Sequence, residues 1–388
     1  MAPSRLRLLM LLSRSALDAR MAVASGALAP LADSIAADLD RLLPDESAWV
    51  PPEKARLTRR GGRCERDGLL LEFDPRSPRR HRCPACDTWY EGEDHYRWWV
   101  MGYQLWLAER AVHAAVLSRL RPAGRHAGLA RAILAALADR YLTYPNADNV
   151  LGPTRPFFST YLESIWLLHV VVAQSLLELG AAPHPLDGRV REQIVEPSSR
   201  LVASFNEGDS NRQVWNSAAL AASGLLLGDQ AMVEEALDGP GGAGWHLSHG
   251  LLEDGTWYEG ENYHLFAHRG LWYLVALAAS AGFPLDLELV ERFDRGFVAP
   301  LLTALPDFTV PARRDSQYGI SLRQWRLAES LELGLARHPD AVELAAGLGV
   351  MYGDGPAGDP QRWRSTAEAE RNVPGVRLTL PYGGAARQ

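Results

Sequence analysis

The sequence predicts an all-α fold, an incomplete (α/α) toroid of helical hairpins, with a small Cys-containing irregular insert near the N-terminus. Three observations predict it. From Tyr96 onward, apolar residues recur at steps of three and four, the spacing of an amphipathic helix. Short breaks separate these segments, and helices joined by short turns pack as antiparallel hairpins. No strict repeat is present, so paired helices are expected instead of a regular solenoid.

Helices are expected through most of residues 96–350. The segments with helical spacing are 98–120, 127–142, 158–180, 188–205, 212–227, 230–237, 262–281, 286–304, 321–337 and 340–348. Their boundaries carry ordinary breaking signals, such as Gly228-Asp229 and the Ala-Gly-Phe-Pro run at 281–284. An earlier helix is expected over 15–43, and a strand signal returns only at 376–380.

The connections between these helices favour a toroid over a superhelical array. Most connections are short, but those at 144–158 and 239–262 are long and carry aromatic and polar residues. Loops of this kind are expected to line one mouth of a toroid, because binding residues gather on loops held by a rigid scaffold. The expected organisation is an N-terminal helical segment, a Cys-containing insert, the toroid and a C-terminal tail, at residues 1–43, 44–95, 96–350 and 351–388.

Composition and charge restrict the function of the chain. Its 388 residues are 47% hydrophobic and 22% charged, as in ordinary folded proteins. The formal net charge of −7 argues against a nucleic-acid partner, because nucleic-acid binders carry a basic footprint. A local basic cleft could still bind an acidic polysaccharide or oligosaccharide.

Signals for export and for membrane insertion are weak. The apolar core at residues 8–12 is too short for a convincing signal peptide, and Arg14 follows it closely. No run of about 18 uncharged apolar residues is present, so no membrane partner is expected. A cytoplasmic location is therefore expected, a periplasmic or secreted one stays open, and the sequence predicts no oligomeric state.

The first cluster of polar residues precedes and opens the helix expected at 212–227. It contains Ser210, Asn211, Arg212, Trp215 and Asn216. Ser210 or Asn211 could simply cap the helix, since either side chain can accept its unpaired amide hydrogens. Arg212, Trp215 and Asn216 are less easily explained as caps. An amide, a guanidinium and an indole on one helix face would suit an acidic sugar ring.

The second cluster occupies residues 254–269 and carries the largest number of titratable groups. Within thirteen residues the sequence brings together Trp257, Tyr258, Tyr263, His264, His268 and Arg269. The two histidines are four apart and share a helix face. Without an HExxH pattern a metal pair is not favoured, and buried histidines or a hydrogen-bonded core tyrosine are the structural alternatives. So many titratable groups at one helix start favour a functional site.

The third cluster contains all three cysteines. Cys83-Pro-Ala-Cys86 follows His81 by two residues, and Cys64 lies earlier in the same insert. Thiolate and imidazole ligands suit Zn²⁺, which prefers four of them. A second CxxC pair is missing, because Asp67 stands where the partner of Cys64 would be. The insert is thus expected to hold a structural zinc site or to be a metal-free loop of the same shape.

The fourth cluster is the Pro-Ala-Arg-Arg-Asp-Ser run at 311–316, which includes Arg314. Asp315 or Ser316 could cap the helix expected at 321–337. Alternatively, the two arginines could bind a carboxylate, which the guanidinium group matches with two parallel hydrogen bonds.

Together these motifs resemble the helical toroid of heparinase II/III-like polysaccharide lyases and alginate lyases. The resemblance spans roughly residues 50–330, and its most specific part is the Asp-Gly, Glu-Gly and Tyr-His pattern within 254–264. The Cys-containing insert, with Phe73-Asp-Pro and His81-Arg-Cys-Pro, is similar to a loop that many relatives carry before the toroid. A C-terminal β-sandwich follows the toroid in that family, and this sequence ends where the sandwich would begin.

The resemblance implies roles for individual residues. Asn211 matches the asparagine that neutralises the uronate carboxylate, and Tyr263 matches the catalytic tyrosine. The residue after the asparagine is often a histidine base in the family, whereas this sequence has Arg212. His264 is a second choice for the base, or it could orient Tyr263. The residues expected to bind substrate are Arg212, Trp215, Asn216, Trp257, Tyr258, His268, Arg269 and Arg314, with the two tryptophans as sugar-stacking platforms.

The expected reaction is β-elimination on a uronic-acid-containing polysaccharide, with no organic cofactor. A base must remove the C5 proton, an acid must protonate the oxygen at C4, and the carboxylate must be neutralised as charge develops. Two alternatives stay open. A toroid glycoside hydrolase needs a pair of carboxylates, which Asp254, Glu259 and Glu261 could supply. A non-catalytic carbohydrate-binding toroid needs neither arrangement.

Overall fold

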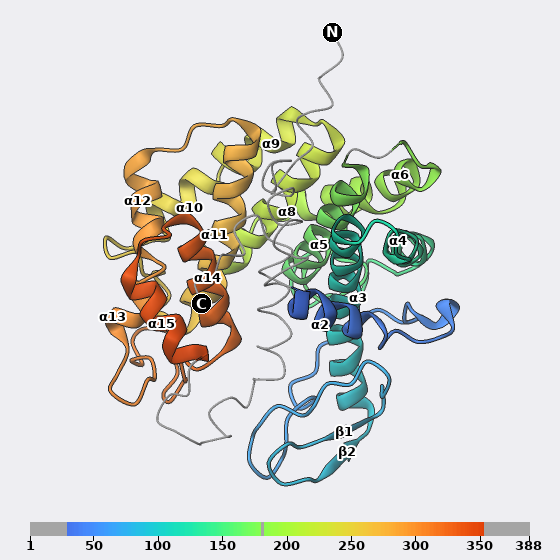
Figure 1. The fold of residues 1–388 in the computed structure, drawn as a ribbon, viewed down its shortest axis with the longest axis horizontal. Coiled ribbons are helices and arrows are strands. Elements are labelled where there is room, and N and C mark those ends of the chain that lie inside the picture. Colours follow the sequence, from blue (N-terminus) through green and yellow to red (C-terminus); the bar gives the residue numbers. More distant parts are fainter. Residues whose placement is uncertain (1–28, 180–181, 353–388) are drawn as a thin grey trace. The chain divides into compact units, whose positions relative to one another are not determined.

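Helices dominate the part of the chain that the computed structural model describes, residues 29–179 and 182–352 (Figure 1). The all-α prediction is therefore confirmed. The chain divides into two compact units, with the boundary between Asn206 and Glu207. A second boundary between the units lies between Ile35 and Ala36, within the first described helix, α2 (Ala29–Leu39).

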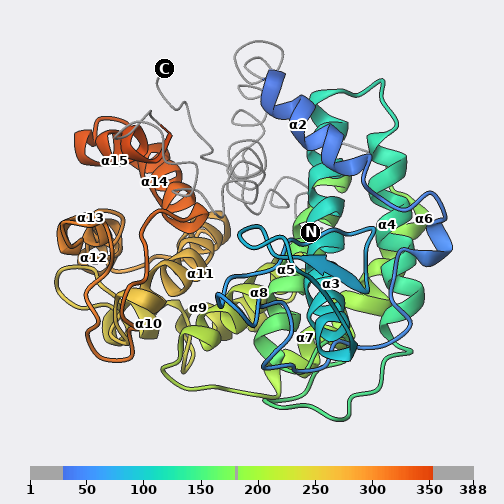
Figure 2. The same cartoon turned by 90° about the horizontal axis from the view of Figure 1, so that it is seen from below.

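The unit formed by residues 36–206 contains helices that follow a small strand hairpin. Its elements are a 3-10 helix at Glu46–Ala48, β1 (Arg80–Arg82), β2 (Trp89–Glu91), α3 (Glu93–Leu120), α4 (His126–Tyr141), α5 (Thr160–Glu178), α6 (Pro185–Val190), a π-helical turn at Arg191–Val195 and α7 (Glu196–Ala203). The long helix α3 packs against both α4 and α5, and α5 packs against α7 (Figure 2).

The interior of this unit holds a buried carboxylate on α5. Glu163 is fully buried and accepts hydrogen bonds from the Tyr141 hydroxyl at 2.5 Å, the Ser198 hydroxyl at 2.6 Å and the Arg155 amide at 2.8 Å. These donors satisfy a charge that would otherwise be costly to bury. Within the described residues α5 is also the helix long and apolar enough to cross a membrane, but 83% of its apolar window is buried, as in a core helix.

Two departures from the expected helices in this unit have local causes. Helix α3 begins at Glu93, five residues before the expected start at Trp98, and Glu93 and Asp94 favour its positive N-terminal end. The expected helix at 188–205 is replaced by α6, the π turn and α7. The wide turn ends two residues before Pro197, which has no amide hydrogen to donate to the preceding turn.

The unit formed mainly by residues 207–352 contains a further series of helices. They are α8 (Asn211–Leu227), α9 (Gln230–Asp238), α10 (Ala243–His249), α11 (Glu261–Ala281), α12 (Leu287–Arg295), α13 (Ala299–Thr303), α14 (Trp325–Arg337) and α15 (Val342–Tyr352). Helix α8 packs against α9 and α11, and α14 packs against α15 (Figure 1).

The turns of this unit follow from the residues that the sequence supplies. Gly228 ends α8 in the left-handed conformation, with φ of 74°, and the next residue, Asp229, caps α9 by accepting the Met232 amide hydrogen. Gly282 ends α11 in the same way, with φ of 68°. Glycine favours both positions because it has no Cβ to oppose a positive φ.

Two other expectations for this unit were wrong. The single helix expected at 286–304 is broken at Gly296, and α13 restarts with Pro300 in its first turn, where proline is tolerated. The connection expected at 239–262 contains α10, whose seven residues are too few to show a helical pattern. Residues 15–28 of the expected N-terminal helix and the strand expected at 376–380 lie outside the described residues.

Candidate functional site

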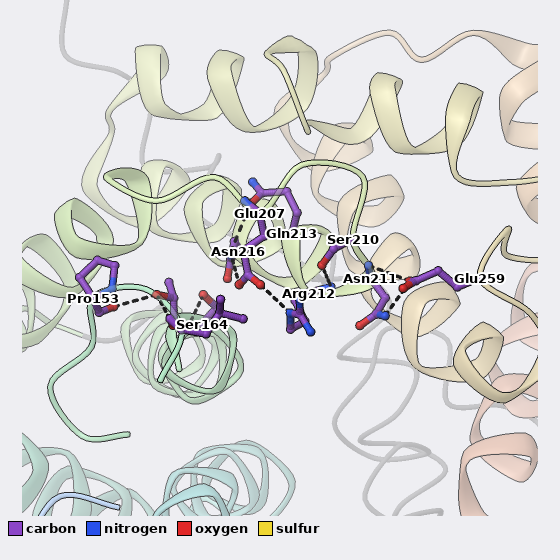
Figure 3. A network of polar contacts seen from close by, with 11 residues as sticks. Pro153, Ser164, Glu207, Ser210, Asn211, Arg212, Gln213, Asn216 and Glu259 are labelled. Carbon is purple, nitrogen blue, oxygen red and sulfur yellow. Dashed lines mark hydrogen bonds and ion pairs between the residues drawn. The ribbon is translucent and has the colours of Figure 1, made fainter. Parts of the chain in front are cut away.

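The first and second polar clusters meet where α8 and α11 begin. Asn211 is the first residue of α8, and Glu259 lies two residues before the start of α11. The Asn211 side-chain amide donates to the Glu259 carboxylate at 2.7 Å, and the Asn211 backbone amide donates to the same oxygen at 3.2 Å (Figure 3). Because the two helices start side by side and pack along their length, they run in the same direction.

The Glu259 carboxylate lies at the positive ends of both helices. Its Oε2 atom also accepts the indole N–H of Trp257 at 2.7 Å, so three donors converge on one oxygen. The N-terminus of a helix favours negative charge because its first amide groups point outward and its dipole is positive there. Glu259 therefore links the two motifs, and it holds the Asn211 amide in one orientation.

A second carboxylate, Glu207, organises the polar residues on the first turns of α8. Its side chain is only 2% exposed and pairs with the Arg212 Nε at 2.5 Å (Figure 3). Its other oxygen accepts the side-chain amide of Asn216 at 3.3 Å. Arg212 keeps 40% of its side chain exposed, whereas Asn216 is fully buried. Of the two, only Arg212 can therefore reach a solvent-borne ligand, and Ser210 takes the cap role by accepting the Arg212 amide hydrogen.

The loop at 311–316 docks on the start of α11. The Ser316 hydroxyl accepts the Asn262 amide hydrogen at 2.9 Å, and the Asp315 amide donates to the Glu259 carbonyl at 3.1 Å. Ser316 thus caps α11 across the fold instead of the helix that follows it in sequence. Gly260 permits this contact, because a Cβ there would lie 2.6 Å from the Ser316 hydroxyl and its φ is 114°.

The two arginines of this loop have different environments. Arg313 pairs with the buried Glu261 carboxylate. Arg314 is exposed, and its Nη1 donates to the Tyr258 carbonyl at 2.9 Å. Arg313 keeps 58% of its side chain exposed, but its charge is paired with Glu261. Among the described residues Arg314 pairs with no carboxylate, so its charge is available for an anionic ligand beside the second motif.

Tyr263 is the third residue of α11 and is partly exposed. Its backbone amide donates to the Gly260 carbonyl at 3.1 Å, which fixes it in the first turn. Among the described residues, no group forms a hydrogen bond with its hydroxyl. Tyr258 is also partly exposed, and its pKa is raised by burial, then by Glu259 and Asp209, with Arg212 opposing the shift. Both phenols therefore lie near the converging helix ends with some access to solvent.

His264 and His268 join α11 to α12 and the turn after it. The Nδ1 atom of His264 accepts the Trp257 amide hydrogen at 3.1 Å, so its Nε2 carries the proton and donates to the Gly296 carbonyl at 2.8 Å. Burial lowers the pKa of His264 to about 4. The Nε2 of His268 bonds the Phe293 carbonyl at 2.9 Å, and its ring stacks on Phe293. Both nitrogens of His264 are thus engaged with the backbone, which does not favour a role as base.

The two tryptophans expected as sugar-stacking platforms are core residues. Trp215 is 1% exposed and Trp257 is fully buried. A buried indole offers no face to a sugar ring, so these expected roles do not fit the structure. Arg269 is half-buried, lies 5.5 Å from the ring centres of both Trp215 and Trp325, and pairs with Glu329 at 3.0 Å. Its guanidinium group therefore interacts mainly with other residues of the protein.

An exposed tryptophan that sequence reasoning did not single out lies near the start of α8. Trp245 on α10 is 41% exposed, and its indole N–H donates to the Asp209 carboxylate at 2.5 Å. Its ring stacks on His249 with centroids 4.1 Å apart. Asp209 directly precedes the cap of α8, so this aromatic face lies beside the first motif. Sequence reasoning missed it because residues 239–262 were interpreted as a loop.

The three cysteines converge in the other unit, as expected. Potential ligand atoms of Cys64, Asp67, Cys83 and Cys86 all lie within 4.8 Å of one another. His81 is not part of this group. It is buried edge-on against Trp98, with ring centroids 5.1 Å apart, and burial lowers its pKa. The fourth candidate ligand is therefore Asp67, and the expectation that His81 is a ligand is not supported by this geometry.

Known proteins resemble this chain in structure but not in sequence. No protein-family model and no curated protein matches the sequence. An alginate lyase from Bacteroides ovatus has a similar structure, with a TM-score of 0.54 and 13% identity over 93% of this chain and 98% of that chain. Alginate lyase A1-III from Sphingomonas species A1 is 16% identical, with a TM-score of 0.47 over 86% of this chain and 93% of that one.

At this low identity the likeness to the Bacteroides ovatus structure shows the fold alone. It confirms the predicted fold class, a helical toroid of the kind found in alginate lyases. The resemblance to heparinase II/III-like enzymes stays a prediction.

Proposed function

We propose that this chain is a polysaccharide lyase that cleaves a uronic-acid-containing polysaccharide by β-elimination. The observation that carries the proposal is the bond between Asn211 and Glu259 at the start of α8 and α11. It places the first turns of both helices together, and the partly exposed Tyr263 lies on one of them, with no hydrogen bond to its hydroxyl from the described residues. The similar fold of an alginate lyase supports the same class of reaction.

The positive ends of the helices suit the anionic part of the substrate. One hydrogen of the Asn211 amide bonds Glu259, and its second hydrogen is left to donate to a uronate carboxylate. Arg212 and Arg314 both keep exposed guanidinium surface near this point. Donors aimed at a carboxylate lower the barrier to C5 deprotonation, because negative charge spreads onto the carboxylate in the transition state.

Tyr263 is the proposed proton-transfer group. Its hydroxyl, as phenolate, would take the C5 proton and then return a proton to the O4 leaving group, so that one residue serves as base and acid. His264 is a poor alternative, since its Nδ1 lone pair and its Nε2 proton are both bonded to backbone groups. Glu259 is a positioning residue in this scheme, because it acts through Asn211.

The exposed aromatic rings are the proposed sugar-binding surfaces. Trp245 and Tyr258 replace Trp215 and Trp257 as stacking surfaces, because a sugar packs on a ring face that is open to solvent. No organic cofactor is required by this chemistry, and the substrate is an acidic polysaccharide or oligosaccharide.

The carboxylates that a glycoside hydrolase would need are already engaged. Glu259 accepts three N–H groups on one oxygen, and Glu261 pairs with Arg313. Asp254 accepts the Thr256 amide hydrogen in a turn. A hydrolase requires one free acid and one free carboxylate on opposite sides of the bond, so these contacts favour the lyase.

A panel of uronate polymers separates the three functions. The protein is incubated with alginate, hyaluronan, chondroitin sulfate, heparin and polygalacturonate, and the ultraviolet absorbance of the unsaturated uronate is followed together with reducing ends. A lyase gives both signals, a hydrolase gives reducing ends alone, and a binding protein gives neither while still retaining a polymer in affinity electrophoresis. Reducing ends without ultraviolet absorbance would overturn the proposal, as would binding without turnover.

A further inference from the structure

Two turns in the Cys-containing insert share one backbone geometry. In residues 64–69, the Cys64 amide donates to the Leu69 carbonyl at 2.8 Å, and the Gly68 amide donates back to the Cys64 carbonyl at 2.9 Å. In residues 83–88, the Cys83 amide donates to the Thr88 carbonyl at 2.8 Å and the Asp87 amide to the Cys83 carbonyl at 3.1 Å. Both turns therefore close with the same pair of hydrogen bonds.

The residues that flank the two turns are also paired in the same way. An antiparallel bridge joins Arg63 to Leu70 around the first turn, and the last pair of β1 and β2 joins Arg82 to Trp89 around the second. The fifth residue of each turn has a positive φ, 71° at Gly68 and 61° at Asp87. The first and fourth residues of each turn are then equivalent, and they are Cys64 with Asp67 in one turn and Cys83 with Cys86 in the other.

The separations in two pairs of these side chains match those of a tetrahedral metal site, and all four ligand atoms lie within 4.8 Å of one another. The sulfur atoms of Cys64 and Cys86 lie 3.6 Å apart, and the Cys83 sulfur lies 3.5 Å from both Asp67 carboxylate oxygens. Zn–S bonds of about 2.3 Å and Zn–O bonds of about 2.0 Å at tetrahedral angles place two sulfurs about 3.8 Å apart and a sulfur and an oxygen about 3.5 Å apart.

We infer that the two turns hold one Zn²⁺ ion through Cys64, Asp67, Cys83 and Cys86. Three thiolates and one carboxylate suit zinc, which accepts sulfur and oxygen ligands in a four-coordinate site. Four protein ligands leave no open position, so the site is structural. The missing second CxxC pair is replaced by a Cys-x-x-Asp pair in a turn of the same shape.

Hydroxyl groups and arginines next to the four ligands can offset the negative charge of such a site. The Tyr90 hydroxyl lies 3.1 Å from the Cys64 sulfur, and the Thr88 hydroxyl lies 3.3 Å from the Cys86 sulfur. Hydroxyl donors next to ligating thiolates orient them and offset their charge. Three thiolates and a carboxylate around Zn²⁺ leave two negative charges, and Arg63, Arg66 and Arg82 lie on or beside the two turns.

The metal would supply stability that the local apolar core lacks. The hydrophobic cluster of this lobe has three buried residues, Cys64, Leu71 and Cys83, with Cys86, Tyr90 and Trp98 packed around them. So few apolar groups bury little surface, and small units of this kind depend on metals or disulfides. Trp98 belongs to α3, so the zinc would fasten the lobe to the start of this helix, which projects from the β1–β2 hairpin in Figure 1.

The test measures bound zinc in the purified full-length protein and in three variants. Asp67→Ala removes one ligand, Asp67→Cys converts the ligand set to four thiolates, and Glu65→Gln changes an exposed carboxylate on the same turn that lies outside the cluster. The readouts are zinc content by mass spectrometry, the rate of zinc transfer to a chromogenic chelator, and the visible spectrum after cobalt substitution.

The wild-type protein should hold one zinc per chain and give the thiolate charge-transfer band of tetrahedral cobalt. Asp67→Ala should release zinc at least about tenfold faster, because loss of a neighbour of the ligands alone weakens binding by about 10–100-fold. Asp67→Cys should strengthen the charge-transfer band, and Glu65→Gln should match the wild type. A reduced, zinc-reconstituted wild type that retains no zinc after gel filtration overturns the inference, and so does Glu65→Gln releasing zinc as fast as Asp67→Ala.

Discussion

The Cys-containing lobe and the paired starts of α8 and α11 both bring together polar groups that are far apart in sequence. The two regions differ in how far these groups are already bonded to one another. In the lobe the four converging groups contact one another and two hydroxyl groups, no basic side chain among the described residues pairs with Asp67, and their ligand atoms lie at metal-binding distances. At the helix starts, most of the polar residues are already bonded to one another through Glu207 and Glu259. In the second region, function therefore depends on the few side chains that remain open.

The proton-transfer role of Tyr263 gives the largest expected effect at the helix starts. Tyr263→Phe should lower lyase turnover by about 10²–10⁴-fold, because only the proton-transferring hydroxyl is lost. The melting temperature should stay unchanged, since no described group bonds this hydroxyl. The measurement is the rate of unsaturated product formation on the polymer that the wild type cleaves.

The matched control for this variant is Tyr318→Phe, which removes the hydroxyl of a tyrosine that is 92% exposed. Tyr318→Phe should keep full activity. Full lyase activity in Tyr263→Phe would refute its role, and an early melting transition would instead identify it as a structural tyrosine.

Glu259→Gln tests whether the helix starts depend on an internal charge. The change keeps the shape of the side chain but removes the negative charge that accepts three N–H groups. Hydrogen bonds to a charged group contribute about 1.5–3 kcal/mol, so the free energy of unfolding in urea should fall by a similar amount. If Glu259 positions Asn211, KM for the polymer should rise more than kcat falls.

Asp254→Asn is the comparison variant, because the hydrogen bond that the Asp254 carboxylate accepts among the described residues is a local turn bond from the Thr256 amide. It should leave KM unchanged. A Glu259→Gln protein with wild-type stability and KM would show that the link between the two motifs has no role in the site.

His264, one of two buried histidines on α11, makes the stability of the fold sensitive to acid. The pKa of His264 is lowered by burial from its ordinary 6.5 to about 4. Between these values the unfolded chain binds a proton that the folded protein excludes, so stability is full above pH 6.5 and falls as the pH drops toward 4. At pH 5 the loss from this residue should be about 2 kcal/mol relative to pH 7.

Urea unfolding at both pH values checks this expectation. In His264→Gln the stability difference between pH 7 and pH 5 should shrink by about 2 kcal/mol, because glutamine has no proton to exclude. His249→Gln is the control, since His249 is exposed on α10. An unchanged pH dependence in His264→Gln would mean that this ring titrates normally in the folded protein.

The sequence predicted local features better than long-range ones. Helical spacing identified α8 and α11 to within one residue at each described end, and the glycine at the end of each helix was read correctly. The convergence of the cysteines also followed from a recognisable spacing. These features depend on residues that are close in sequence, so periodicity and turn chemistry determine them.

The parts of the site that escaped prediction depend on partners far along the chain. Ser316 caps α11 although 54 residues separate it from Asn262, and no local pattern indicates that bond. The burial of Trp215 and Trp257 is set by packing between helices, which composition does not encode. Trp245 was overlooked because a helix of seven residues, flanked by glycines, has too few turns to show a period.

The smallest expected effect distinguishes the exposed tryptophan from the buried ones. If Trp245 stacks on a sugar ring, Trp245→Ala should raise KM by about two- to tenfold, since an aromatic contact contributes about 0.5–1.5 kcal/mol beyond its buried area. Turnover at saturating polymer should change little, because a stacking ring transfers no proton in the reaction. Trp245→Phe should recover most of the affinity by restoring a ring face, although it lacks the bond to Asp209. Trp89→Ala, which removes a half-exposed tryptophan from the Cys-containing lobe, should leave KM unchanged. Equal KM values for wild type and Trp245→Ala would place the sugar elsewhere and leave Tyr258 as the remaining exposed ring beside Glu259.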